Sequence, residues 1–193
     1  MIQVRTGVFE TNSSSTHSIA IPKSQPSSLP KHIWFNFGEF GWEFGEADPA
    51  DYFYTAIYET SKTLDEAKKK VERLKDILDA HNIGYDFQRP EIDDRNSYFY
   101  LEGGYIDHGY ELVNFVNDLL NDETKLLNFL SDGLVFTGND NNGPEEQAFI
   151  NREEEFIDTD DYDFKSNIWI CHRIKNPYYM SDHDNYEWYY KNN

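Results

Sequence analysis

One segment, Thr63–His81, reads TLDEAKKKVERLKDILDAH and is the clearest helix in the sequence. Thr63 and Glu66 have the spacing of a helix-capping box. Apolar residues then recur every three or four positions and so fall on one stripe of the helix: Leu64, Ala67, Val71, Leu74 and Leu78. The opposite face mixes acidic with basic residues, which favours an ordinary solvated surface over a basic face for RNA. The segment predicts an amphipathic helix packed on a core.

Helices and strands are both predicted before and after this segment. Asp48-Pro49 has the residue types of a helix start, because Asp caps a helix and Pro fits its first turn. Further helices are expected at residues 112–120 and 123–130. Strands are expected at residues 18–21, 33–37, 134–137 and 167–174, the last as a central strand. The pattern predicts a single α+β domain over residues 1–193, with a mixed or antiparallel sheet flanked by helices.

The composition is typical of a folded protein of moderate size. The 193 residues are 38% hydrophobic, with 14 Tyr, 14 Phe and 4 Trp, so a largely aromatic core is expected. The lone Cys171 excludes an intramolecular disulfide, and we expect no secretory leader. No apolar run approaches the roughly 20 residues of a membrane span. These features predict a soluble protein of the cytoplasm that does not bind membranes.

The charge of the chain limits its partners. A formal net charge of −19 works against indiscriminate binding to nucleic acid, because such binding depends on Lys and Arg. Ten acidic residues and one base, Arg152, lie within residues 139–163, an acidic segment that could form an appendage to the domain. Two kinds of partner remain: a protein with a basic groove, or a substrate whose local contacts overcome the repulsion.

The polar chemistry is concentrated near the N-terminus, in FETNSSSTHS at residues 9–18. We expect a loop between two short strands, whose small polar residues turn amide groups outward and bind a phosphate. His17 is the candidate general acid or base, because imidazole titrates near neutral pH. The alternative is a solvated linker in which Ser and Thr only favour turns. The expected substrate-binding residues are Asn12, Ser13, Ser14, Ser15 and Thr16.

Two further polar segments are candidates for the same site. Asp107 and His108 lie in a glycine-rich stretch, and both are candidate catalytic residues, although Asp107 could equally cap the following helix. Asn139 and Asp140 follow a predicted strand. There Asn139 is a candidate for binding substrate and Asp140 for binding a metal such as Mg²⁺, while a simple turn is the alternative. The segments form one site only if the fold brings them together.

A fourth stretch, residues 37–46, alternates aromatic residues with Gly and Glu. Aromatic residues could stack on bases, but the adjoining glutamates would repel phosphates. The pattern favours core packing with a close approach of the backbone.

The motif at residues 9–18 resembles the signature of an uncharacterised family from large phages and mobile elements of Gram-positive bacteria. GEFGW at 38–42, YIDH at 105–108 and TGNDN at 137–141 are similar to later blocks of that family, so the resemblance extends to about residue 142. In that family Asp-His is often followed by Gln-Ser, whereas in this chain it is followed by Gly109-Tyr110. The resemblance implies a setting, counter-defence in the cytoplasm of a bacterial host. Some CRISPR inhibitors from this setting imitate DNA and others damage guide RNA.

Two functions follow from these observations. The first is an enzyme that acts on phosphodiesters of RNA or nucleotides, such as a guide RNA, with His17, His108 and Asp107 as catalytic residues. This hypothesis predicts that His17→Ala abolishes activity without unfolding the protein. The second is a non-enzymatic acidic mimic of nucleic acid, which binds a basic host protein such as a CRISPR effector through residues 139–163. The hydroxyl-rich motif favours the enzyme, because a mimic does not need it.

Overall fold

The largest sheet in the computed structural model, which describes residues 15–41, 44–93, 100–107, 109–139, 148–163 and 168–191, has four strands. Their order is β12-β1-β9-β4, and all neighbouring pairs are antiparallel. The sheet therefore joins segments from the beginning, the middle and the end of the chain. Its strands are β1 (Ser15–Pro22), β4 (Gly45–Ala47), β9 (Leu134–Asn139) and β12 (Tyr186–Lys191).

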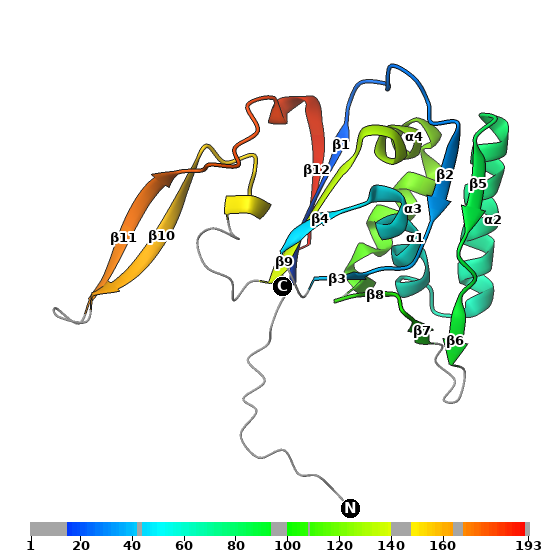
Figure 1. Cartoon of the computed structure of the whole chain (residues 1–193), viewed down its shortest axis with the longest axis horizontal. Helices are drawn as coiled ribbons and strands as arrows, with labels where there is room; N and C mark the ends of the chain where they lie inside the picture. Colours follow the sequence, from blue (N-terminus) through cyan, green and yellow to red (C-terminus); the bar gives the residue numbers. More distant parts are fainter. Residues whose placement is uncertain are drawn as a thin grey trace, which may run out of the picture.

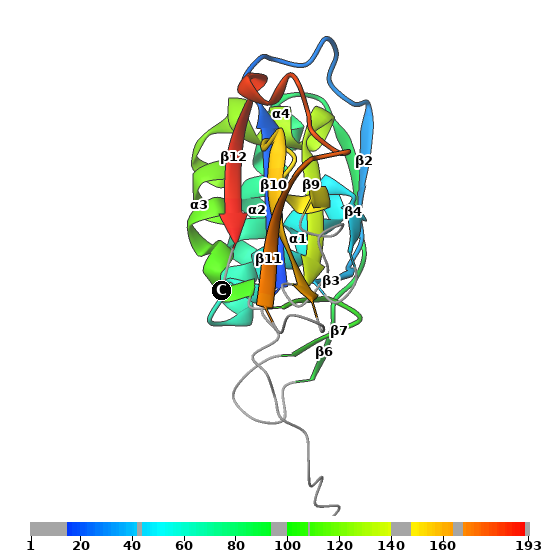
Figure 2. The ribbon, with the colours of Figure 1, turned by 90° about the vertical axis from the view of Figure 1, so that its left-hand side faces the viewer.

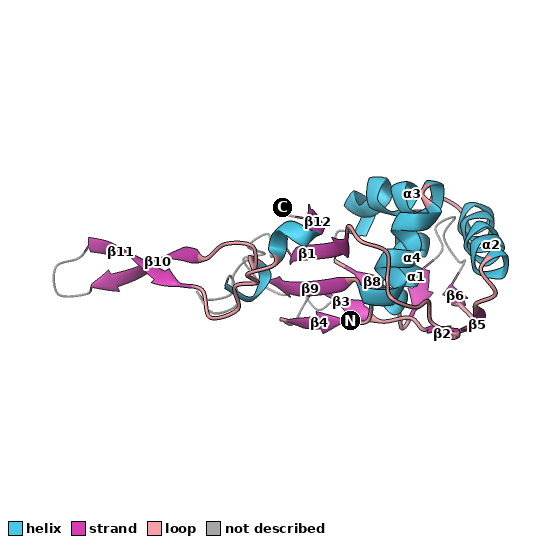
Figure 3. Ribbon diagram, turned by 90° about the horizontal axis from the view of Figure 1, so that it is seen from above, coloured by secondary structure: helices cyan, strands magenta, loops and turns pink. Residues whose placement is uncertain are grey.

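Four helices pack on one side of this sheet, whereas the helical turn at residues 148–150 lies on the other side (Figures 1 and 3). They are α1 (Pro49–Glu59), α2 (Leu64–Ala80), α3 (Val113–Asn121) and α4 (Glu123–Asp132). The core between them is aromatic, as the composition predicts: the buried Phe53 ring meets the rings of Phe115 and Phe129 edge-on. Among the described residues, no helix has the length and apolar character needed to cross a membrane.

Two of the predicted helix starts are confirmed by their caps. The Asp48 side chain accepts hydrogen bonds from the amides of Ala50 and Asp51, and Pro49 is the first residue of α1. The Thr63 side chain accepts from the amide of Glu66 at the start of α2. These caps fix where α1 and α2 begin, and α1 carries two residues of the site described below, Tyr52 and Glu59.

Short strand pairs also form outside the four-stranded sheet. The pair that matters for the site is β3 (Glu39–Phe40) with β8 (Tyr105–Ile106), which run parallel with Phe40 opposite Ile106. This register places Gly41 beside Asp107. The remaining pairs are β2 (His32–Phe35) with β5 (Gly84–Phe87) and β6 (Glu91–Asp93) with β7 (Tyr100–Glu102), and the 3-10 helices are η1 (Gly109–Leu112) and η2 (His183–Asn185).

A two-stranded hairpin, β10 (Phe156–Asp163) with β11 (Ile168–Lys175), stands off the side of the sheet opposite the helices (Figures 1 and 3). Seen from that side, it lies in front of the four-stranded sheet (Figure 2). The prediction of a central strand at residues 167–174 is therefore wrong. The apolar residues of this strand suggest a buried position, but in the described structure it pairs only with the acidic β10.

Candidate functional site

The N-terminal polar motif ends inside a strand. β1 begins at Ser15, so residues 15–18 do not belong to the expected loop, and all four side chains are buried. Neighbouring strands pair with β1 on both edges, and hydrogen bonds hold the side chains of Ser15, His17 and Ser18. For example, the Ser18 hydroxyl donates to the Ile150 carbonyl at 2.7 Å. Ser15 and Thr16, predicted to bind substrate, are thus buried, whereas Asn12, Ser13 and Ser14 lie outside the described residues.

His17 points from β1 toward α1. Its Nδ1 atom lies 2.6 Å from the Tyr52 hydroxyl, in a hydrogen bond whose direction follows the tautomer of the ring. Both side chains are 0% exposed, and burial raises the pKa of Tyr52 well above its usual value, so the phenol stays neutral. His17 therefore joins the sheet to the central helix. The catalytic role expected for His17 stays a prediction.

Ser15, His17 and Asp107 meet around Gly41, and we call these four residues the Gly41 cluster. A Cβ atom at Gly41 would lie 2.9 Å from His17 Nε2, 2.9 Å from Ser15 Cβ and 3.0 Å from Asp107 Cβ. Gly41 also has a φ of +110°, which only glycine adopts without strain. The Ser15 hydroxyl donates to the Asp107 carbonyl at 3.0 Å. The close backbone approach predicted for residues 37–46 is confirmed here.

The third polar segment lies beside the first. In the antiparallel pair of β1 and β9, Asn139 is opposite Ser15 and Thr137 is opposite His17. The fold thus brings together the described parts of all three predicted segments. His108 and Asp140 lie outside the described residues, and so does the side chain of Asn139. Within the described part of the chain, no three His, Cys, Asp or Glu residues lie together as a metal site would require.

A pocket of about 230 Å³ opens beside the Gly41 cluster. We call it the Glu59 pocket; its lining residues are Glu59, Tyr105, Ile106, Asp107, Gly109 and Tyr110. Asp107 belongs to both the cluster and the pocket, and its Oδ1 atom accepts a hydrogen bond of 3.0 Å from the Tyr105 hydroxyl. Burial, followed by this bond, raises the pKa of Tyr105 to about 12. Tyr105 therefore remains a neutral hydrogen-bond donor at physiological pH.

Glu59 is the residue of the pocket that the sequence analysis did not identify. It is the last residue of α1, and burial raises its pKa to about 7. A Cβ atom on Gly109 would lie 2.9 Å from Glu59 Cβ, so the pocket wall packs closely against this side chain. One sequence signal was available: an acid that ends a helix with no base in its last turn opposes the helix dipole. Because the helix dipole disfavours an acid at this position, its presence points to a role other than stabilising the helix.

We compared the chain with protein-family models, curated proteins and solved structures, and none of the three comparisons found a match. The chemistry of the site is therefore inferred from its residues alone.

Proposed function

We propose that this protein is an enzyme that cleaves phosphodiesters of RNA or of a nucleotide at the Glu59 pocket. One observation carries the proposal: Asp107 connects the pocket to the Gly41 cluster, where polar segments remote in sequence come together. A carboxyl group with a shifted pKa, such as that of Glu59, in a pocket beside packed polar residues is typical of active sites. An acidic mimic of nucleic acid does not need such an arrangement.

Glu59 is the proposed general base and acid. With a pKa of about 7 it is present in both protonation states near neutral pH. In RNA cleavage the 2′-oxygen forms a bond to phosphorus while the bond from phosphorus to the 5′-oxygen breaks. Ionised Glu59 accepts the proton of the attacking hydroxyl, and a second group returns a proton to the leaving oxygen. His108, the neighbour of Asp107 in the sequence, is proposed for that second role.

The other predicted residues have supporting roles in this proposal. His17 is a positioning residue, because its buried ring packs against Gly41 and holds β1 on α1 through Tyr52. Asn12, Ser13 and Ser14 come directly before β1 in the sequence and are proposed to bind the phosphate. Mg²⁺ is the proposed cofactor, because a carboxylate such as Asp107 is a ligand it takes together with substrate phosphates. A divalent cation would also offset the repulsion between the acidic protein and its substrate.

The test is cleavage of labelled single-stranded RNA, a CRISPR guide RNA and single-stranded DNA, each with and without Mg²⁺. Glu59→Gln keeps the size of the side chain but cannot transfer the proton, so we expect the cleavage rate to fall by about 100-fold or more. Glu72→Gln on α2 is the matched control, because Glu72 is exposed and its only described ion pair is with Lys75. Equal cleavage by wild type and Glu59→Gln would contradict the proposal.

An acidic mimic is the second candidate, because the β10–β11 hairpin extends from the body of the protein (Figure 1). Glu154, Glu155 and Asp158 are exposed where the hairpin begins. We propose that this acidic surface would dock in the basic groove of a nucleic-acid-binding host protein, such as a CRISPR effector.

Charge reversal separates this surface from the general charge of the protein. Changing Glu153, Glu154 and Glu155 together to Lys should weaken binding to such a partner, and more so at low salt. The matched control makes the same charge change on the exposed face of α2, at Asp65, Glu72 and Asp76, away from the hairpin. Equal affinities of the two triple variants would argue against a role for the hairpin.

A further inference from the structure

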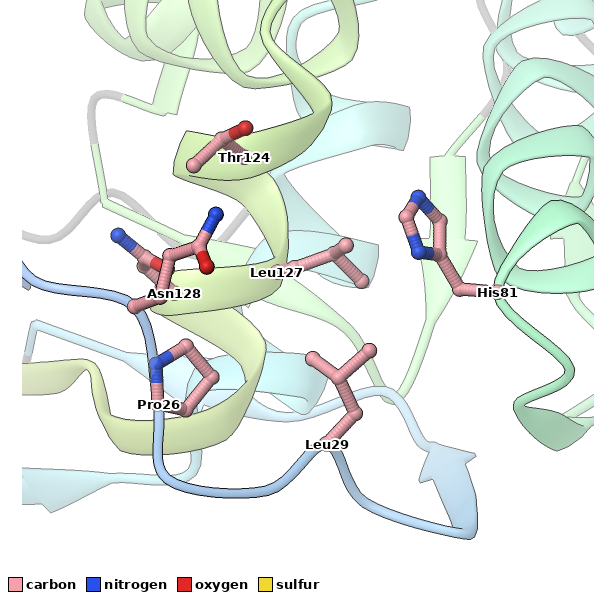
Figure 4. A pocket seen from close by; sticks show the side chains of 7 residues that line it. Pro26, Leu29, His81, Thr124, Leu127 and Asn128 are labelled. Atoms are coloured by element: carbon pink, nitrogen blue, oxygen red, sulfur yellow. The ribbon is translucent and has the colours of Figure 1, made fainter.

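We propose that a second pocket binds a neutral molecule of about one ring in size that carries an N–H or O–H donor. The pocket lies between the loop at residues 23–31, the end of α2 and α4 (Figure 4). It has a volume of about 220 Å³ and shares no lining residue with the Glu59 pocket. We call it the Asn128 pocket; it is lined by Gln25, Pro26, Leu29, His81, Thr124, Leu127 and Asn128.

The Asn128 amide gives the pocket its specificity. Asn128 is 4% exposed, and its Nδ2 atom donates to the Pro22 carbonyl at 2.9 Å. This bond fixes the orientation of the amide, because exchanging its oxygen and nitrogen would set two acceptors against each other. The Oδ1 atom is then a buried acceptor with no hydrogen-bond partner among the described residues. Because such an atom has lost its water, a ligand that brings a donor stabilises it by more than an exposed acceptor would gain.

The walls set the size and polarity of the ligand. Leu29 and Leu127 lie between Asn128 on one side and His81 on the other, and Pro26 lies below Asn128 (Figure 4). None of the described lining residues is Asp, Glu, Lys or Arg, and His81 has its Nε2 atom 3.6 Å from the Glu123 carboxylate. A charged ligand would therefore lose its hydration without gaining a partner. A cavity of about 150 Å³ holds benzene, so this pocket accommodates a ring with a small polar substituent.

Phenol and toluene are the probes, because they are similar in size and only phenol carries a donor. NMR titration of the full chain should show both shifting the amide signals of Leu29, His81 and Thr124. Asn128→Leu keeps the branched shape of the side chain, although Leu is larger, and removes the acceptor. We expect the ratio of phenol to toluene affinity to fall by about fivefold in Asn128→Leu. An unchanged ratio would overturn the assignment of Oδ1 as the recognition group.

A second variant locates the binding without changing Asn128 or its bond to Pro22. Leu29 is only half-buried, so Leu29→Trp is expected to fill the pocket while the protein stays folded, and to remove the binding of both probes. Val113→Trp, an exposed position at the start of α3, is the control and should bind both probes as wild type does. The proposal is wrong if wild type binds neither probe, or if Leu29→Trp still binds phenol.

Discussion

At the scale of single residues, Gly41 holds the candidate site together. Gly41→Ala would place a Cβ atom within 3.0 Å of Ser15, His17 and Asp107 and would also strain a φ of +110°. We expect the free energy of unfolding to fall by about 3 kcal/mol. Gly103→Ala is the control, because Gly103 also has a positive φ, +74°, but nothing lies within 4 Å of its added Cβ. It should cost about 1 kcal/mol, and urea unfolding that gives equal losses would contradict the close packing.

The burial of His17 changes the expected effect of its substitution. His17→Ala leaves a cavity and removes the partner of the buried Tyr52 hydroxyl, so it should destabilise the protein by about 2–4 kcal/mol rather than leave the fold unaffected. Tyr52→Phe keeps the ring and should cost about 1 kcal/mol. Urea unfolding of both variants tests this order. A fully stable His17→Ala protein would show that the ring is not part of the packed core.

Glu59 makes stability depend on pH in a defined direction. Its pKa is about 7 in the folded protein and near the usual 4.5 when unfolded, so the folded state binds more protons between these values. The free energy of unfolding should therefore fall as pH rises from about 4.5 to 7, and Glu59 should add no further change above that. Because the carboxyl is partly exposed, we expect Glu59→Gln to stabilise the protein at pH 8 by only about 1 kcal/mol. The melting temperatures of wild type and Glu59→Gln would contradict this if they changed with pH in the same way from pH 4 to 8.

At the scale of elements, the helices follow from local signals and the strand partners do not. The cap at Asp48, the cap at Thr63 and the apolar stripe of α2 are contained in the sequence around them, so α1 and α2 begin where predicted. The helices at residues 113–121 and 123–132 and the strand at 134–139 also match their predictions. The prediction that β11 is a central strand was wrong, because its apolar residues do not specify a partner strand. That partner is determined by contacts between residues remote in sequence.

The β10–β11 hairpin should be separable from the rest of the fold. Its base is anchored independently: the Arg152 guanidinium lies 3.9 Å from the centre of the Phe136 ring, and Asn176 donates to the carbonyls of Ala148 and Asn151. Asp158 and Arg173 are opposite each other in the hairpin, so residues 159–172 can be replaced by an Asn-Gly turn. We expect the melting temperature to change by less than about 5 °C.

The shortened protein also separates the two candidate functions. An enzyme that acts at the Glu59 pocket should keep its cleavage activity without the hairpin. An acidic mimic should bind its partner more weakly, because the deletion removes Asp160, Asp161 and Asp163 while the exposed acids at the base of the hairpin remain. On this one variant, calorimetry measures the melting temperature and the cleavage assay measures the retained activity. Cooperative unfolding at a much lower temperature would contradict the view that the hairpin is peripheral.

At the scale of the whole molecule, the site could be predicted only in part. The sequence identified Ser15, His17 and Asp107 by their residue types, and the fold places all three around Gly41. It did not reveal that they are buried, because polar residues ordinarily indicate exposure, and β1 reverses this through its place inside the sheet. Glu59 was missed for a related reason: burial raises its pKa, and the residues that pack beside it, such as Gly109, are remote in sequence.

The most direct test of the central claim is the pH dependence of RNA cleavage. With Glu59 as general base, the rate of wild type should rise as pH increases through about 7, because the ionised carboxylate accepts the proton. In Glu59→Gln this inflection should be absent and the residual rate about 100-fold lower. Absence of cleavage of single-stranded RNA, guide RNA and DNA at every pH, with and without Mg²⁺, would contradict the enzyme and leave the acidic mimic. Cleavage with the same inflection in Glu59→Gln would place the catalytic base elsewhere.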